Sequence, residues 1–313
     1  MFPIYVSRTH KIARTIFGLF VLLSSSNSLA DTAMDPGLAA DDSLANITMA
    51  QPDALGAIRT APAIMPLLPK YQVALGGGWS SDPLRRISLS AIDSSNGPVA
   101  LGLDFKRTNG TPNANTQDLP GWYRPNQDFD NETSEIVAGG AAAVSFANRQ
   151  RSIGLGGHYI GRRTTFTENV NIFELTASGG LHIKEQLLVT LTTRDILQND
   201  GPVHIGSGIR WGPTDTSFNG SPFRSYGGIE LNVDTELDSN GYRIGYWGLS
   251  GDLLATEAFI LRTGYRNSQG QNLLGTGFAI DNVSFGFEYG ALLQLTPDGV
   301  GTHSHIVGCR IRL

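Results

Sequence analysis

The sequence predicts an all-β protein, an antiparallel transmembrane β-barrel of about fourteen strands with an N-terminal plug segment. Three observations lead to this fold class. The N-terminus carries a short apolar run typical of an export signal, residues 31–70 lack periodicity, and from Tyr71 onward apolar and polar residues alternate. The alternation is clearest in "VSFGFEYGALLQL" (283–295), where the period of two indicates a strand and not a helix.

Residues 1–30 are expected to be a cleavable signal peptide. The apolar run Thr15–Leu23 is shorter than the roughly 20 residues that a membrane-spanning helix needs. Small residues, Ser28 and Ala30, stand at the two positions that a signal peptidase reads. Three basic residues precede the apolar run: Arg8, Lys11 and Arg14. The sequence therefore predicts export and a mature chain that begins at Asp31.

The charge of the mature chain disfavours nucleic acid as a partner. The whole chain has 23 basic and 28 acidic residues, and three basic residues but no acidic ones lie in 1–30, so the mature chain has 20 basic residues and a net charge of −8. Cys309 is the only cysteine, so no intrachain disulfide can form. His303 and His305 share one face of a strand but have no acidic or cysteine partner nearby in the sequence. No metal and no cofactor are expected.

Residues 31–70 are expected to form a separate leader before the main fold. The segment is rich in Ala, Pro and acidic residues and shows no alternation. Its prolines exclude a long helix or a central strand: Pro36, Pro52, Pro62, Pro66 and Pro69. The stretch "DALGAIR" (53–59) is compatible with one short helical turn.

Residues 71–313 are expected to form the barrel, because alternating segments follow one another to the C-terminus. Turn-rich pieces such as "SSNGP", "DSNG" and "NSQGQN" separate them. The predicted strands are 71–79, 86–93, 99–107, 135–146, 151–163, 171–183, 187–195, 203–211, 225–235, 241–249, 257–266, 273–281, 283–292 and 303–312.

An even strand count places both chain ends on one side of the barrel. With the leader in the periplasm, the odd-numbered connections face outward, including 108–134 and 293–302, and the even-numbered ones are short, including an Asp281-Asn282 turn. The connection 212–224 is long on the short side, so it is either a periplasmic insertion or the mark of a miscounted strand.

The two faces of the strands differ sharply. One face is apolar, for example Leu101, Leu103 and Phe105, and the other carries glycine and charge. We expect the charged face to line the lumen, with Asp104, Lys106, Arg210, Glu230, Arg243, Arg262, Glu288 and Arg310. Long strands, aromatic residues near strand ends and export without disulfides favour lipid against the apolar face. In the alternative, a secreted soluble β-sandwich, the apolar face packs inward.

The order of signal, leader and strands resembles the outer-membrane barrels related to long-chain fatty-acid and hydrocarbon transporters, a superfamily that includes a secretion-system barrel. In this superfamily the leader folds into the lumen as a plug, with an Asn-Pro-Ala type motif after an acidic and small run. Here Ala50-Gln51-Pro52 replaces the Asn-Pro doublet. The resemblance implies that the plug residues are Asp41, Asp42, Asn46 and Pro52.

A plug also has a physical basis. A fourteen-stranded lumen is too wide for wall side chains alone to fill, and glycine residues on the inner face leave room for a segment. The inward charges can pair with each other and with Asp41 or Asp42. In the alternative, the leader is a disordered periplasmic tail.

The connection 108–134 is the largest outward feature, and aromatic residues stand among its polar ones: Trp122, Tyr123 and Phe129. They form either a binding surface or a cap over the barrel mouth. No Gly-x-Ser-x-Gly elbow precedes a helix and no nucleophile has an evident base, so no enzymatic activity is expected.

Two functions remain open at this stage. The first is passive uptake of small hydrophobic molecules across the Gram-negative outer membrane, which is the activity that the resemblance implies. The second is a non-transporting barrel that anchors a secretion or envelope complex. The expected partners are outer-membrane lipid and either a small hydrophobic ligand or an envelope protein.

Overall fold

The structure is a computed structural model, and it describes residues 42, 44–51, 55–67, 70–81, 84–110, 133–164, 170–183, 186–196, 203–212, 227–238, 241–255, 258–268, 271–282, 284–297 and 299–312. The signal peptide, Asp41, Pro52, and the loop residues Trp122, Tyr123 and Phe129 lie outside these residues.

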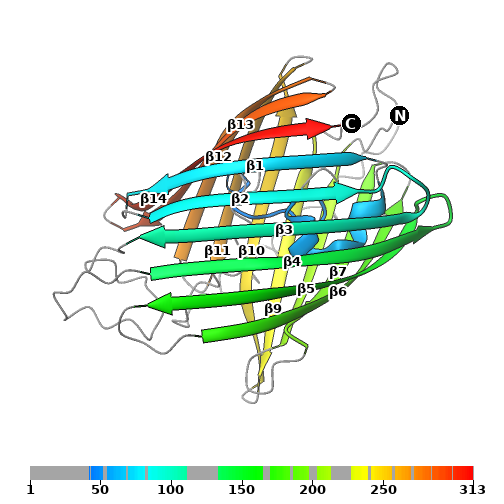
Figure 1. Ribbon diagram of the computed structural model, residues 1–313, viewed down its shortest axis with the longest axis horizontal. Helices are drawn as coiled ribbons and strands as arrows, with labels where there is room; N and C mark the ends of the chain where they lie inside the picture. Colours follow the sequence, from blue (N-terminus) through cyan, green and yellow to red (C-terminus); the bar gives the residue numbers. More distant parts are fainter. Residues whose placement is uncertain are drawn as a thin grey trace, which may run out of the picture.

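Antiparallel strands form one closed barrel (Figure 1). Each strand pairs with its neighbours in sequence, and β1 pairs with β14 to close the ring. The strands are β1 (Tyr71–Ser80), β2 (Leu84–Asp93), β3 (Val99–Gly110), β4 (Thr133–Phe146), β5 (Arg151–Thr164), β6 (Val170–Ile183), β7 (Leu187–Arg194), β8 (Val203–Trp211), β9 (Ile229–Asp238), β10 (Gly241–Leu254), β11 (Phe259–Ser268), β12 (Gln271–Asp281), β13 (Phe285–Thr296) and β14 (Gly299–Arg312).

The predicted fold class, an antiparallel barrel of fourteen strands, is confirmed. We call the end where β1 begins and β14 ends the proximal end, and the other end the distal end. Several strands are longer than predicted. The predicted outward loop 293–302 is wrong, because β13 and β14 continue through it and pair Leu295 with Val300. The Asp281-Asn282 turn is also wrong in length, since β13 begins only at Phe285.

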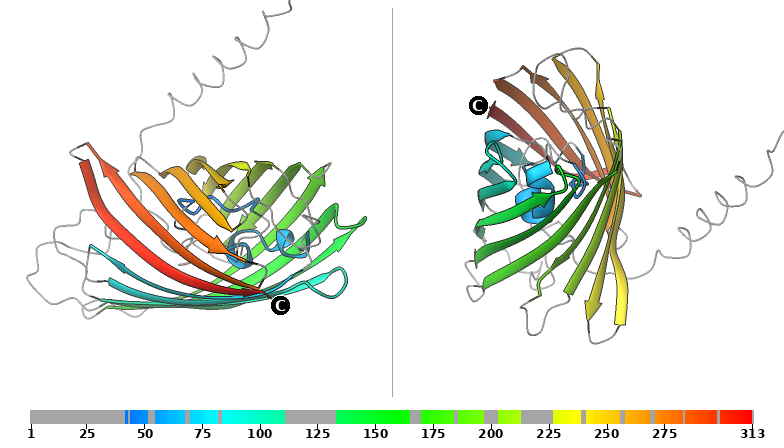
Figure 2. Two further views of the ribbon diagram at one scale, coloured as in Figure 1. Left: turned by 90° about the horizontal axis from the view of Figure 1, so that it is seen from above. Right: turned by 90° about the vertical axis from the view of Figure 1, so that its right-hand side faces the viewer.

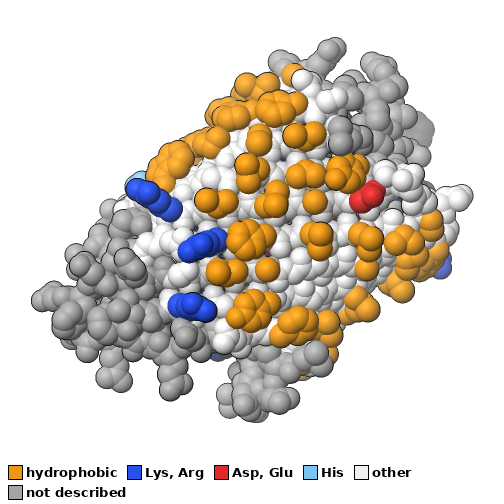
Figure 3. All heavy atoms as spheres, viewed as in Figure 1, with side chains coloured by type: hydrophobic (Ala, Val, Ile, Leu, Met, Phe, Trp, Pro, Cys, Tyr) orange, Lys and Arg blue, Asp and Glu red, His pale blue; other side chains and the backbone are white. Residues whose placement is uncertain are grey.

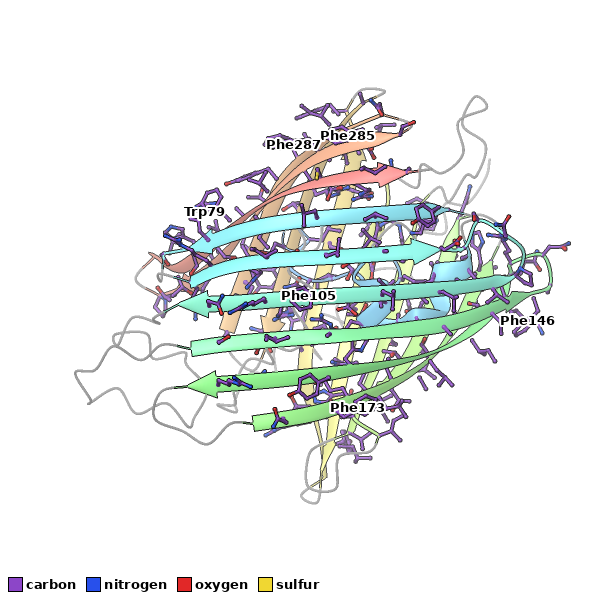
Figure 4. All side chains as sticks on the ribbon, viewed as in Figure 1. Trp79, Phe105, Phe146, Phe173, Phe285 and Phe287 are labelled. Carbon is purple, nitrogen blue, oxygen red and sulfur yellow. The ribbon has the colours of Figure 1, made fainter. Side chains whose placement is uncertain are left out.

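The exterior of the barrel is apolar. Figure 3 shows hydrophobic side chains spread over the wall, and Figure 4 labels outward aromatic residues with Trp79 at the distal end and Phe146 at the proximal end. Leu103, in the middle of β3, is 68% exposed. So large an exposed apolar surface on a closed barrel is stable only against lipid. The soluble β-sandwich is therefore wrong.

The described residues of 42–70 lie inside the barrel, and we call them the inner segment (Figure 2). Its regular elements are a single helical turn, α3 (Ala57–Thr60), and a 3-10 helix, η2 (Pro62–Leu67). The turn falls where "DALGAIR" predicts one. In the described part of the chain, no helix is long and apolar enough to cross a membrane. Every described side chain of the inner segment is buried.

Candidate functional site

Glycines on the inner wall admit the backbone of the inner segment. A Cβ atom at Gly264 of β11 would lie 2.2 Å from the carbonyl oxygen of Leu44, and one at Gly102 of β3 would lie 2.8 Å from the Ile58 side chain. Both distances are shorter than van der Waals contact, so a larger residue would push the segment away. The same holds for other inward glycines of the wall: Gly154, Gly206, Gly208 and Gly248.

Polar side chains of the wall satisfy the backbone of the inner segment. Ser250 Oγ donates to the carbonyl of Ile47 at 2.9 Å, and Thr192 Oγ1 donates to the carbonyl of Thr60 at 3.0 Å. Neither carbonyl belongs to a strand ladder, because Ile47 lies outside the regular elements and Thr60 ends α3. Since an unpaired buried carbonyl is costly, the wall hydroxyls fix where the segment lies.

Glu230 and Asp252 contact the inner segment from β9 and β10. The backbone N–H of Ala50 donates to Glu230 Oε1 at 2.7 Å, and Gln51 Nε2 donates to Asp252 Oδ2 at 3.1 Å. Arg210 of β8 forms an ion pair with the same Asp252 at 2.9 Å. Asp252 was missed in the sequence because the strand was predicted to end at residue 249. Ser250 and Asp252 are polar residues two positions apart, and this alternation could have extended the predicted strand to include Asp252.

Asp104 of β3 forms an ion pair with Arg59 of the inner segment and accepts a hydrogen bond from His158 of β5, at 2.7 Å from Nε2. All three side chains are at least nine-tenths buried. A buried carboxylate is stable only when cations and donors surround it, so Arg59 and Asp104 depend on each other. Arg59 was missed because its partner is 45 residues away along the chain.

Two of the four predicted plug residues, Asp42 and Asn46, are described, and both lie at the start of the inner segment. Asp42 Oδ2 lies 3.6 Å from Arg86 of β2 and accepts a hydrogen bond from Ser304 of β14 at 3.3 Å. Asn46 is 4% exposed and adopts a positive φ of 60°, a backbone conformation that asparagine tolerates better than most residues. Asp42 thus bridges to the wall near its seam, where β1 meets β14.

The remaining predicted lumen residues pair within the wall. Lys106 contacts Glu135 of β4 at 3.2 Å, and Glu288 accepts contacts from both Arg310 and Arg262, the latter at 3.4 Å. Arg243 differs from the others, because its side chain is 42% exposed while it pairs with Glu236 at 2.5 Å near the distal end. Further pairs that the prediction did not describe join Arg312 with Asp281 and join Arg194 and His204 with Asp234.

The interior also has an apolar part. Ile58, Ile64 and Met65 of the inner segment form one cluster with Ile92 and Leu188 of the wall. A second cluster joins Ile47, Met49 and Ala61 with Tyr246 of β10. In the described residues, no group of three or more His, Cys, Asp or Glu could hold a metal ion. The interior of the barrel therefore presents both apolar and charged surfaces.

No protein-family model and no curated protein sequence matches the chain. Solved structures do. The CymD monoaromatic hydrocarbon channel is similar with a TM-score of 0.61 at 10% identity, over 89% of this chain and 97% of that one. A Pseudomonas aeruginosa FadL homologue has a TM-score of 0.59 at 8% identity, over 93% and 99% of the two chains.

The Pseudomonas putida toluene transporter TodX is similar as well, with a TM-score of 0.55 at 8% identity over 88% of this chain and 96% of that one. Identities this low show a shared fold and no more. They confirm, at the level of the fold, the resemblance that the sequence carries. The chain is a fourteen-stranded barrel that shares its fold with the CymD channel, the FadL homologue and TodX.

Proposed function

We propose that this protein is an outer-membrane channel for the passive uptake of small hydrophobic molecules, with the inner segment as its plug. The observation that carries the proposal is the inner segment itself, which packs on glycines and polar groups of the inner wall. The fold shared with a monoaromatic hydrocarbon channel and a toluene transporter supports the choice of substrate class. Residues 1–30 would direct export and be removed.

In this proposal the two kinds of contact have different tasks. The ion pair of Arg59 with Asp104 and the contacts of Ala50 and Gln51 fix one closed position, because buried polar groups tolerate little displacement. The apolar clusters around Ile58 and Ile47 provide a surface on which a small hydrocarbon can replace segment side chains. Uptake then requires the segment to move while the barrel stays closed.

The proposed orientation places the proximal end in the periplasm and the connection 111–132 outside. The aromatic residues Trp122, Tyr123 and Phe129 would then meet the substrate first. Heat-dependent mobility of the purified protein on a detergent gel would establish a closed barrel. Protease added to intact cells should cut within 111–132. Cleavage only within 212–228 would reverse the orientation.

Reconstituted vesicles test the transport itself. A small fluorescent hydrocarbon should reach an enclosed aqueous binding protein faster through the wild-type chain than through protein-free vesicles. A sugar of similar size serves as control and should enter at the protein-free rate, because a segment-filled lumen leaves no open aqueous pore. Equal entry of hydrocarbon with and without the protein would contradict the proposal.

A non-transporting anchor is the second candidate. The number of contacts that tie the inner segment to the wall favours it, since a firmly held segment suits a rigid platform. An anchor would co-purify with an envelope protein in stable stoichiometry and would give no hydrocarbon flux. Flux without a stable partner would support the channel instead.

A further inference from the structure

Three arginines face outward at the distal end of the barrel. Arg85 is near the start of β2, Arg107 is near the end of β3 and Arg163 is near the end of β5, and all three are exposed. Figure 3 shows basic side chains gathered beside the apolar wall. A charge on the outer wall is costly at the middle of the bilayer and tolerated at its edge, so these residues mark the level of the lipid head groups.

The strand register joins them into one row across the wall. Arg85 pairs with Asn109, Asn109 pairs with Ser134, and Ser134 pairs with Arg163. Arg107 lies diagonally beside this row, and its Nε donates to Asn109 Oδ1 at 3.2 Å. With neighbouring strands about 4.8 Å apart, Arg85 and Arg163 are roughly 14 Å apart, with Arg107 between them. We call Arg85, Arg107, Asn109, Ser134 and Arg163 together the arginine row.

Aromatic residues continue the row on the other side. Trp79 of β1 is opposite Arg85, and His305 of β14 is opposite Trp79. The Trp79 and His305 rings are stacked with centroids 5.5 Å apart, and His305 Nδ1 lies 2.7 Å from the Tyr289 hydroxyl. Amphipathic rings of this kind prefer the boundary between lipid tails and head groups. They support the same level in the membrane as the arginines.

In the described part of the chain, no Asp or Glu lies within ion-pair distance of Arg85, Arg107 or Arg163, although the inward-facing arginines nearby do pair, as Arg162 does with Glu135. The protein as a whole is acidic, with a net charge of −5. A basic group on the outer wall beside lipid attracts anionic lipid head groups.

We propose that the arginine row binds a lipid whose head group carries two or more phosphate groups, in the leaflet that surrounds the distal end. A guanidinium binds phosphate through two parallel hydrogen bonds, and the spacing of Arg85, Arg107 and Arg163 lets one head group reach more than one of them. Asn109 and Ser134 supply polar groups between them. The inference depends on the membrane location of the barrel and not on its transport activity.

The test is lipid binding by the full mature chain in neutral detergent, measured by native mass spectrometry. The ligand is lipid A with two phosphates, and the controls are the singly phosphorylated and dephosphorylated forms. The test variant is Arg85→Gln/Arg107→Gln/Arg163→Gln. The matched control is Arg151→Gln, which removes an exposed outward arginine at the proximal end of β5. Heat-dependent gel mobility shows that each variant is folded.

We expect the triple variant to bind the doubly phosphorylated lipid at least about tenfold more weakly than wild type, and Arg151→Gln to stay within about twofold. Wild type should also prefer the doubly phosphorylated form over the others. Equal binding by wild type and triple variant, or an equal loss in Arg151→Gln, would overturn the inference. If the triple variant does not fold, Arg107→Gln alone should weaken binding by about threefold, and no loss there would overturn it too.

Hydrocarbon uptake in vesicles of neutral phosphatidylcholine separates this inference from the proposed function. The triple variant should transport like wild type there, because no phosphorylated head group of this kind is present. Absence of transport in the wild type would remove the channel proposal and leave the lipid site untouched.

Discussion

Replacement of Gly264 by alanine tests how the inner segment is held. The new Cβ would lie 2.2 Å from the Leu44 carbonyl oxygen and 2.3 Å from its carbon, both backbone atoms. Overpacking of this kind costs about 1–3 kcal/mol. Because one strand ladder on each side of Gly264 holds the barrel wall, we expect the segment to move and not the wall.

A cost of about 1–3 kcal/mol corresponds to a 5- to 150-fold shift toward the displaced segment. Hydrogen exchange of the Ile47 amide, which donates to the Leu44 carbonyl at 3.0 Å, should accelerate by that factor. The rate of hydrocarbon uptake should rise together with the exchange rate, up to the point where movement of the segment no longer limits entry. The wall amides of β11 should exchange as in the wild type.

Gly77→Ala is the matched control. Gly77 faces outward on β1, and no neighbouring atom lies within 4 Å of the position that its new methyl group would take. Alanine stabilises a strand by about 0.5–1 kcal/mol relative to glycine at either position, so Gly77→Ala has this gain without the clash. Wild-type exchange and uptake in Gly264→Ala would refute the reasoning. Faster exchange throughout the barrel would refute it as well, because the clash would then fall on the wall.

Three further predictions concern single contacts. Arg59→Met removes the cation from Asp104 and should weaken the closed position by about 3 kcal/mol, since His158 remains as a partner, so amide exchange in the inner segment should accelerate. Adding Asp104→Asn should slow this exchange part of the way back to the wild-type rate, and no such slowing would argue against a direct pair. Leu103→Arg should cost the whole barrel about 2–4 kcal/mol in reversible unfolding from vesicles, and a cost near zero would place Leu103 away from lipid. Glu230→Leu removes the acceptor of the Ala50 backbone N–H. Hydrogen exchange of the Ala50 amide should then accelerate by an amount that corresponds to about 1–3 kcal/mol, and unchanged exchange would show that the contact is dispensable.

The alternation of the sequence predicts the barrel well, and it fails where the register slips. Strict alternation from Arg243 would place Tyr246 on the outer wall. A β-bulge between Ile244 and Tyr246 reverses the phase, and Tyr246 lies buried against Ile47 instead. A second irregularity lies between Leu293 and Leu295, in the segment 293–302 that was predicted to be a loop and is strand in the structure. Bulges add one residue to one strand, so a period of two does not reveal them.

The candidate site was only partly visible in the sequence. Inward glycines such as Gly264 could be assigned to a face from the period of their strand. The partners of the inner segment could not, because the pairing of Arg59 with Asp104, or of Ala50 with Glu230, joins residues 45 and 180 positions apart. The expected partner of Asp42 was one of the predicted lumen charges, and the structure gives Arg86, which is not among them.

A reversible tether between the inner segment and the wall tests the central claim most directly. A Cβ at Gly248 would lie 2.8 Å from Ile47 Cγ1, so Ile47→Cys and Gly248→Cys should bring two thiols within disulfide reach, where Cβ atoms are about 3.8 Å apart. Cys309→Ser removes the one native thiol, and Ile47→Cys alone is the control.

The measurement is hydrocarbon flux into vesicles before oxidation, after oxidation and after reduction, with the disulfide verified by mass. A mobile plug predicts flux that falls to the protein-free rate on oxidation and returns on reduction, with no change in the single-cysteine control. Full flux through the tethered protein would contradict the account, because the substrate would then pass without movement of the inner segment.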